Sequence, residues 1–130
     1  MESQHLSVFI RRSVDAVYEY ASNPENLPEW AEGLSVGIEL VDGEWVSISP
    51  LGAVTVEMSP RNALGVLDHW VTTAEGDTFY NPVRVIEADG GAEVVFTLRR
   101  QPGMSDDAFE ADAIAVVTDL ATLKGVLERG

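Results

Sequence analysis

Hydrophobic and polar residues alternate at the start of the chain, and this alternation predicts a first strand over residues 5–12. Leu6, Val8 and Ile10 share one side of that strand, as expected when only one face is buried. Ser13 follows as a candidate helix cap, because its hydroxyl can accept a hydrogen bond from the first turn. Hydrophobic residues then recur at helical spacing, at Val14, Val17, Tyr18 and Ala21. The pattern therefore predicts a short helix after the first strand.

A second short helix is predicted over residues 27–33, with Pro28 tolerated in its first turn and Gly33 ending it. Six runs of β-forming residues follow, separated by turn residues at the spacing of hairpins. They cover residues 36–41, 44–50, 53–59, 64–73, 78–88 and 92–100. This spacing predicts a β-meander.

The last segment, residues 105–128, predicts one long helix. Ser105 is its candidate N-cap, and Asp106 and Asp107 suit the positive end of the helix dipole. Its hydrophobic residues recur at spacings of four and three, and further ones widen the stripe. The stripe comprises Phe109, Ala113, Val116, Leu120, Leu123 and Leu127, widened by Ile114, Val117 and Ala121. We expect this helix to lie lengthwise on the sheet, which is the only partner large enough.

This order of elements resembles the SRPBCC superfamily, the helix-grip fold of START domains and of the birch-pollen-allergen type. The residues that carry the resemblance are Ser13-Val14-Asp15-Ala16-Val17-Tyr18-Glu19-Tyr20, Asn23-Pro24-Glu25-Asn26-Leu27-Pro28-Glu29-Trp30 and Asp119-Leu120-Ala121-Thr122-Leu123-Lys124. The last of these is similar to the polyketide cyclase/dehydrase-like branch. The resemblance covers residues 1–130 as a single domain. It implies an α+β fold in which a seven-stranded antiparallel curved sheet wraps around the C-terminal helix.

The same resemblance implies an apolar cavity, which in relatives holds lipids, hormones or polyketide-like molecules. It carries over no catalytic residue, because the superfamily has no shared catalytic motif. Which side chains of this chain face the cavity depends on the hairpin registers, since a loop changed by one residue reverses the faces.

Three-residue loops ending at Gly43 and Gly52 are predicted for the first two hairpins, because glycine suits the left-handed last position. They place Ile38 opposite Val46, and Val46 and Ile48 opposite Val56 and Val54. A loop over residues 74–76 pairs Val71 with Phe79, His69 with Asn81 and Leu67 with Val83. A Gly90-Gly91 loop pairs Val83 with Leu98 and Val85 with Phe96. The inner face is then apolar except at His69, Asn81 and Arg100, while Arg84 lies on the outer face in a cross-strand ion pair.

A competing register uses a two-residue Glu75-Gly76 loop, which would turn Asp68 and Trp70 inward and expose His69. We rank it second because it would also expose Leu67 and Val71.

The candidate ligand site follows from the preferred register and from the small residues in the first half of the long helix. Its predicted residues are His69, Asn81, Leu67, Val71, Phe79, Val83, Phe96, Met104, Phe109 and Ala113, with Met104 and Phe109 near the mouth and the helix leucines sealing the core. Two interpretations of His69 and Asn81 stay open. They orient a ligand, or they only satisfy each other's hydrogen bonds. Similarly, the helix alanines either leave room for a ligand or serve helix propensity, with Phe109 filling the gap.

Composition narrows the functional classes. The 130 residues carry 22 acidic and 8 basic side chains, a net charge of −14, so phosphate backbones and anionic lipid surfaces are repelled. Cysteine is absent, which removes disulfides and thiolate metal sites. The only histidines, His5 and His69, stand far apart, and no nucleotide-binding or hydrolase motif is present. We expect no metal, no cofactor, no nucleic acid partner, no membrane insertion and a cytoplasmic location.

Three functions are compatible with the sequence pattern, the resemblance and the composition. The first is binding of a small hydrophobic molecule, whether lipid, aromatic or polyketide-like, in the cavity. The second is a cofactor-free cyclase or dehydratase that uses His69 as acid or base. The third is a protein-interaction module like the chaperone ATPase activators of this fold, with the acidic surface engaging a basic partner.

Overall fold

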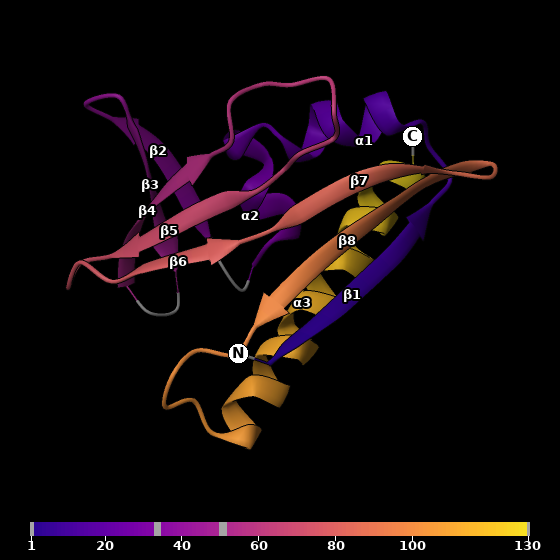
Figure 1. The fold of residues 1–130 in the computed structure, drawn as a ribbon. Helices are drawn as coiled ribbons and strands as arrows, with labels where there is room; N and C mark the ends of the chain where they lie inside the picture. The colour runs from indigo at the N-terminus through magenta and orange to yellow at the C-terminus, as the bar shows by residue number, and fades with distance from the viewer. Residues whose placement is uncertain (1, 33–34, 50–51, 130) are drawn as a thin grey trace.

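The computed structural model describes residues 2–32, 35–49 and 52–129. Within them lie eight antiparallel strands, three α-helices and one short 3-10 helix (Figure 1). In chain order these are β1 (Ser3–Ile10), α1 (Val14–Ala21), the 3-10 helix η1 (Pro24–Asn26), α2 (Leu27–Trp30), β2 (Gly37–Val41), β3 (Glu44–Ser49), β4 (Gly52–Met58), β5 (His69–Thr73), β6 (Thr78–Asn81), β7 (Val83–Ala88), β8 (Gly91–Arg99) and α3 (Asp106–Glu128).

The strands form two sheets, so the prediction of one seven-stranded sheet is wrong. One sheet has the order β1-β8-β7 and the other the order β2-β3-β4-β5-β6. The predicted run over residues 78–88 is divided at Pro82, which has no backbone N–H to continue the ladder. Its carbonyl still accepts a hydrogen bond of 2.9 Å from Thr97 N. The α+β class, the antiparallel pairing and the long C-terminal helix are as predicted, and α3 passes behind β8 and β1 in Figure 1.

The two short helices differ in how well the sequence predicted them. Ser13 caps α1, since its Oγ accepts a hydrogen bond of 3.1 Å from Ala16 N. The second predicted helix is shorter than expected, because α2 ends at Trp30. Its predicted last residue, Gly33, lies outside the described residues.

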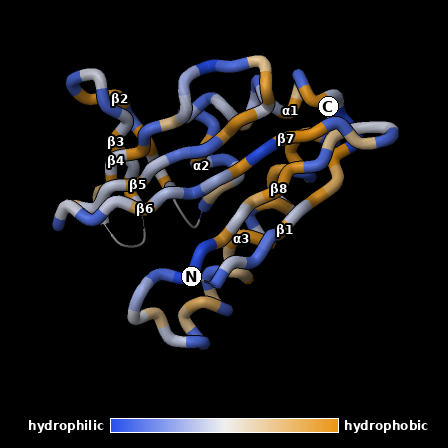
Figure 2. The backbone as a smooth tube through the Cα atoms, in the orientation of Figure 1, coloured by the Kyte–Doolittle hydropathy of each residue, from blue (hydrophilic) through white to orange (hydrophobic). Residues whose placement is uncertain are grey.

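Two buried hydrophobic clusters hold the elements together. The larger joins α1 and the end of α3 to β1, β7 and β8, and the smaller joins α2 to β4 and β5. Figure 2 shows hydrophobic segments gathered where α1, β7 and β8 meet. On α3, the predicted stripe is buried at Phe109, Leu120, Leu123 and Leu127.

The predicted widening of that stripe is wrong. Ile114 is 61% exposed and Val117 is 52% exposed, and Ala121 is also exposed. A helix places successive residues about 100° apart, so only part of its circumference can contact the strands. These three residues lie outside the covered part.

The registers of the first two hairpins also differ from the prediction. Leu40 lies opposite Trp45 and Ile38 opposite Ser47, because the loop is the two-residue Asp42-Gly43. Both loop residues have positive φ, 52° and 82°, as a type I′ hairpin requires. In the next hairpin, the residues opposite Val54 and Val56 are Ser47 and Trp45, and residues 50–51 of its predicted loop lie outside the described residues. As a result Ser47 is buried on the inner face and Ile48 is 51% exposed on the outer one.

The two later hairpins keep the predicted faces. His69 lies opposite Asn81 and Val71 opposite Phe79, so the preferred register is confirmed and the competing one, with Asp68 and Trp70 inward, is wrong. In the last hairpin the predicted partners are wrong. Each observed partner in β8 lies two residues before the predicted one, so the same side chains still face inward. Val83 lies opposite Phe96 and Val85 opposite Val94, and the loop is Asp89-Gly90. Gly91 stays in the strand, where a Cβ atom would come 2.3 Å from the Ile10 carbonyl oxygen.

Candidate functional site

A cavity of about 270 Å³ lies between the inner face of the sheets and α3. Its walls come from β5, β6, β8, the α2 segment and the middle of α3. The described residues that line it are Leu27, Trp30, Ala31, His69, Val71, Phe79, Asn81, Phe96, Leu98, Asp112, Ala115, Val116, Asp119 and Leu120. Asp112 and Ala115 are its exposed members, so the cavity opens beside them. Most of the wall is apolar, with polar groups at a few points.

Five of the ten predicted site residues line this cavity, namely His69, Asn81, Val71, Phe79 and Phe96. Strand alternation and the confirmed register between β5 and β6 bring them together. Their role in binding a ligand stays a prediction.

The other five predicted residues lie elsewhere. Leu67 and Val83 belong to the larger core cluster. Phe109 and Ala113 line a separate groove that also includes Leu6 of β1. Met104 precedes α3, and its carbonyl accepts hydrogen bonds from the Arg100 guanidinium at 2.9 and 3.2 Å.

The predicted ligand space under the first half of α3 is therefore not part of this cavity. It corresponds to the separate groove, and its role in binding stays a prediction. The helix turns Phe109 and Ala113 toward β1, whereas Asp112, Val116 and Asp119 face the cavity. Arg100, predicted to reach the inner face, instead pairs with Glu2 and Asp106 and is not part of the described lining.

His69 is the most deeply buried polar group of the lining, at 8% exposure. Its Nδ1 lies 3.3 Å from the Leu67 carbonyl oxygen. A carbonyl can only accept, so Nδ1 carries the proton and Nε2 of the neutral ring is an acceptor. Burial lowers the pKa of His69 below 6.5, which keeps the ring neutral at pH 7. The ring also contacts Phe96 edge-on, at 6.3 Å between centroids and 71° between planes.

Asn81 lies directly opposite His69, but no hydrogen bond joins the two side chains, both of which the structure describes. The interpretation in which each residue satisfies the other is therefore wrong in its geometry. Among the described residues, none bonds to His69 Nε2. Both side chains keep hydrogen-bonding capacity beside the cavity.

Three polar members of the lining were missed from the sequence. Trp30 was not among the predicted site residues, and its Nε1 is buried without a hydrogen-bond partner among the described residues. Asp112 and Asp119 were not among the predicted site residues either. Their spacing of seven residues on one helix, with Val116 between them, is the signal that places both on one face. Burial raises the pKa of Asp112 above its usual value, because the carboxylate is partly desolvated at the cavity mouth.

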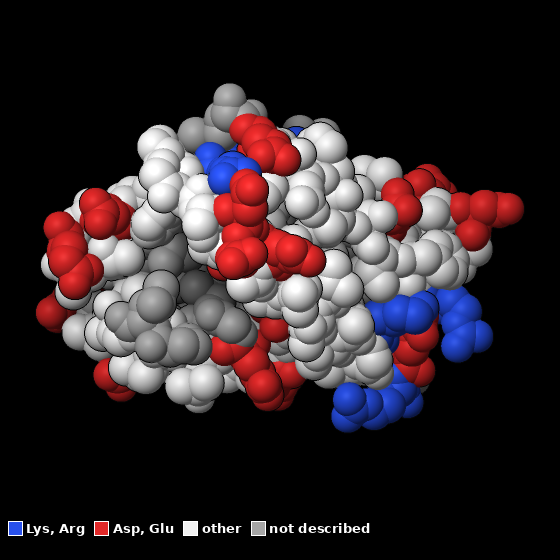
Figure 3. All heavy atoms as spheres, turned by 90° about the horizontal axis from the view of Figure 1, so that it is seen from below, with Lys and Arg blue, Asp and Glu red and all other residues white. Residues whose placement is uncertain are grey.

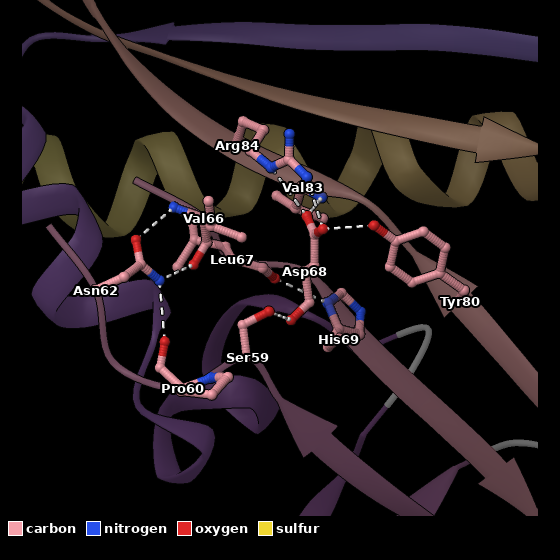
Figure 4. Close-up of polar contacts among 10 residues, drawn as sticks. All are labelled: Ser59, Pro60, Asn62, Val66, Leu67, Asp68, His69, Tyr80, Val83 and Arg84. Atoms are coloured by element: carbon pink, nitrogen blue, oxygen red, sulfur yellow. Dashed lines mark hydrogen bonds and ion pairs between the residues drawn. The ribbon is translucent and has the colours of Figure 1, made fainter. Parts of the chain in front are cut away.

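A polar network centred on the buried Asp68, the residue before β5, lies next to His69 (Figure 4). The Asp68 carboxylate accepts hydrogen bonds from Tyr80 Oη at 2.5 Å, from Val83 N at 2.8 Å and from Arg84 at 2.7 and 3.1 Å. The predicted cross-strand ion pair of Arg84 is confirmed, with Asp68 as its partner. Burial alone would raise the pKa of Asp68, but the hydrogen bonds from Arg84, Tyr80 and Val83 together lower it.

This Asp68 network spans the break at Pro82, because its donors come from both β6 and β7. On the same outer face the Tyr80 ring stacks on Trp70, at 5.1 Å between centroids and 23° between planes. Asp68 therefore bonds to Tyr80, Val83 and Arg84, whereas the next residue, His69, lines the cavity.

Neither a metal site nor a membrane-spanning helix is found among the described residues. The described residues contain no group of three or more His, Cys, Asp or Glu side chains placed to hold a metal ion. None of the described helices is both long enough and apolar enough to span a bilayer.

No family model matches the sequence, and no curated protein matches it. Solved structures do resemble its fold. Ara h 8.0201 has a TM-score of 0.71 at 10% identity and is covered over 99% of each chain. DynU16, from the dynemicin biosynthetic locus, has a TM-score of 0.71 at 14% identity, with 98% of this chain and 48% of that chain covered. The Aha1 dimer from Colwellia psychrerythraea has a TM-score of 0.73 at 15% identity, with 98% of this chain and 97% of that chain covered.

The names of these three proteins indicate different roles. At sequence identities of 10–15%, the similarity shows a shared fold and no shared function. The architecture of this chain is the helix-grip fold that its sequence pattern indicated.

Proposed function

We propose that the protein binds a small hydrophobic molecule in the cavity between the sheets and α3. The observation that carries this proposal is the cavity itself, whose wall is mainly apolar and has polar groups at only a few points. Ligand sites of soluble proteins have this composition, because apolar walls supply affinity and sparse polar groups supply orientation.

The volume limits the size of the ligand. An apolar cavity of about 150 Å³ is enough for benzene, so about 270 Å³ suits one or two aromatic rings or a short alkyl chain. Of the three ligand classes that the sequence left open, a small aromatic molecule therefore fits best.

Substitution at the mouth tests the proposal. Ala115 is exposed and lines the opening, so Ala115→Trp should fill it without disturbing the buried core. Ala111 is also exposed on α3 but is not part of the described lining, so Ala111→Trp is the matched control. Thermal unfolding and calorimetric titration with phenylbutanol give the readouts.

A ligand at 100 times its Kd stabilises the folded state by about 2.7 kcal/mol. We expect that gain for the natural protein and for Ala111→Trp, and at least about a tenfold weaker Kd for Ala115→Trp. Equal binding by both variants would place the ligand elsewhere.

A second candidate function is proton transfer on a ketone, as in a cyclase or dehydratase, with His69 as the base. It is favoured by the neutral His69 ring, whose Nε2 bonds to none of the described residues, and by Asn81 at the opposite position of the next strand. The imidazole would take a proton from the carbon beside a carbonyl, and the Asn81 amide would donate a hydrogen bond to the resulting enolate oxygen.

Deuterium exchange tests this second function without knowledge of the natural substrate. Benzylacetone in D₂O should gain deuterium beside its carbonyl when the protein is present, and His69→Gln should abolish the gain while ligand binding persists. Exchange at the same rate in His69→Gln would exclude His69 as the base.

A further inference from the structure

The polar groups around the cavity are mostly hydrogen-bond acceptors. His69 Nε2 is an acceptor because Nδ1 holds the proton against the Leu67 carbonyl. Asp112 and Asp119 contribute carboxylates from one face of α3. Asn81 can either donate or accept. The remaining group, Trp30 Nε1, is a donor but is closed off from solvent.

Positive charge is missing from the cavity wall. All eight Lys and Arg side chains belong to the part of the chain that the structure describes, and none of them is in the lining. Arg84 pairs with Asp68 on the outer face, and Arg100 pairs with Glu2 and Asp106. Arg11 and Lys124 both pair with Glu128 near the end of α3. On the face drawn in Figure 3, acidic side chains are spread from end to end and basic ones gather mainly at one end.

From these two observations we infer that the cavity selects molecules with an apolar body and a protonated amine or another hydrogen-bond donor, and rejects carboxylates such as fatty acids. This inference rests on the proposed binding function and adds the chemical class of the ligand. The amine would lie at the mouth beside Asp112, with the apolar body between Phe79, Phe96 and Leu98.

The physical reason is the sign of the charge at the mouth. A ligand ammonium group would form a charge-assisted hydrogen bond with the Asp112 carboxylate, which is stronger than a neutral one. A ligand carboxylate would lose its hydration and meet a like charge without a cation to compensate. The raised pKa of Asp112 agrees with this description, because its carboxylate is partly desolvated although the residue is exposed.

Three probes with the same apolar body test the inference: phenylbutylamine, phenylbutanol and phenylbutyrate. Calorimetric titration near pH 7 should give the order amine, alcohol, carboxylate, with the amine binding at least about tenfold more tightly than the carboxylate. Asp112→Asn should reduce the amine-to-carboxylate ratio about fivefold or more and leave the affinity for the alcohol unchanged.

The matched control is Asp107→Asn, which removes the same charge from an exposed position of α3 outside the described lining. It should leave the ratio unchanged, which separates a local effect of Asp112 from the attraction of the whole acidic surface for cations.

Each other outcome has a definite meaning. If phenylbutyrate binds as tightly as the amine, or if Asp107→Asn lowers the ratio as much as Asp112→Asn does, the inference is wrong and the binding function stands. If none of the three probes binds and none raises the Tm, both the inference and the binding function are wrong.

Discussion

At the scale of single residues, the Asp68 carboxylate contributes more than its place on the outer face suggests. It is 5% exposed and accepts hydrogen bonds from Tyr80, Val83 and Arg84. Asp68→Ala would leave the buried Val83 N–H without a partner and Arg84 without its carboxylate. We expect the free energy of unfolding to fall by about 2–3 kcal/mol, measured by urea denaturation.

Glu75→Ala is the control for that change, because Glu75 is exposed in the loop after β5 and should alter stability by less than about 0.5 kcal/mol. If Asp68→Ala were equally mild, the Asp68 network would not hold the strands at the Pro82 break.

The buried His69 should make the free energy of unfolding depend on pH. Its pKa is lowered in the folded state by burial, so between pH 6.5 and the lower folded value only the unfolded chain binds the proton. The contribution of this group to stability is therefore complete above about pH 6.5 and is lost as the pH falls below it. Urea denaturation from about pH 7 to about pH 5 should show the free energy of unfolding decreasing.

His69→Gln should remove that part of the pH dependence. A decrease of the same size in His69→Gln would assign the effect to other groups.

At the scale of elements, the turn between β2 and β3 decides which side chains of β3 face inward. Gly43 has φ 82° and nothing within 4 Å of the position where a Cβ atom would stand, so Gly43→Ala tests backbone strain alone. We expect the free energy of unfolding to fall by about 1–2 kcal/mol, because L-residues are strained in the left-handed region.

Gly37→Ala is the matched control on the same hairpin. Its Cβ atom would also meet nothing within 4 Å, and its φ is not in the left-handed region. Urea denaturation should show it neutral or slightly stabilised, by up to about 1 kcal/mol. Equal losses in both variants would mean that the turn does not select the register.

The same turn explains why one register was predictable and another was not. Between β5 and β6, apolar residues alternate clearly on both strands, so only one register buries Val71 and Phe79 together. In β3, valine and isoleucine alternate with serines, and aligning the apolar set suggested the wrong face. The two-residue Asp42-Gly43 turn instead sets a different register. In that register Ser47 is buried and Ile48 is exposed.

At the scale of the whole molecule, the net charge of −14 opposes the compact state through self-repulsion. Raising NaCl from about 0.02 M to about 0.5 M shortens the screening length from roughly 20 Å to roughly 4 Å. We expect the Tm to rise, by roughly 4 °C for each kcal/mol of repulsion removed.

The charge-reduced variant with Glu39→Lys and Glu75→Lys changes the net charge by +4, from −14 to −10. Both residues are exposed, so this variant should gain less from salt than the natural protein. A Tm that falls with salt in both proteins would show that ion pairs outweigh the repulsion.

The site itself could be predicted only in part. Strand alternation identified His69 and Asn81, and with them Val71, Phe79 and Phe96. The residues of α3 that line this cavity were not predicted, because the pattern of small and large residues pointed to the first half of the helix. In the sequence, Asp112 and Asp119 cannot be distinguished from surface carboxylates. Only the packing of the sheets against α3 places them beside the cavity. No local pattern in the sequence indicates that Trp30 Nε1 is a buried donor to which none of the described residues bonds.

Local physical chemistry in the sequence determined the identity and order of most elements, since periodicity, caps and turn residues act over only a few positions. Tertiary structure alone decided the division into two sheets, the phase of α3 and the chemistry of the cavity wall. Those features depend on which distant segments exclude water from one another, and burial of that kind is a property of the assembled fold.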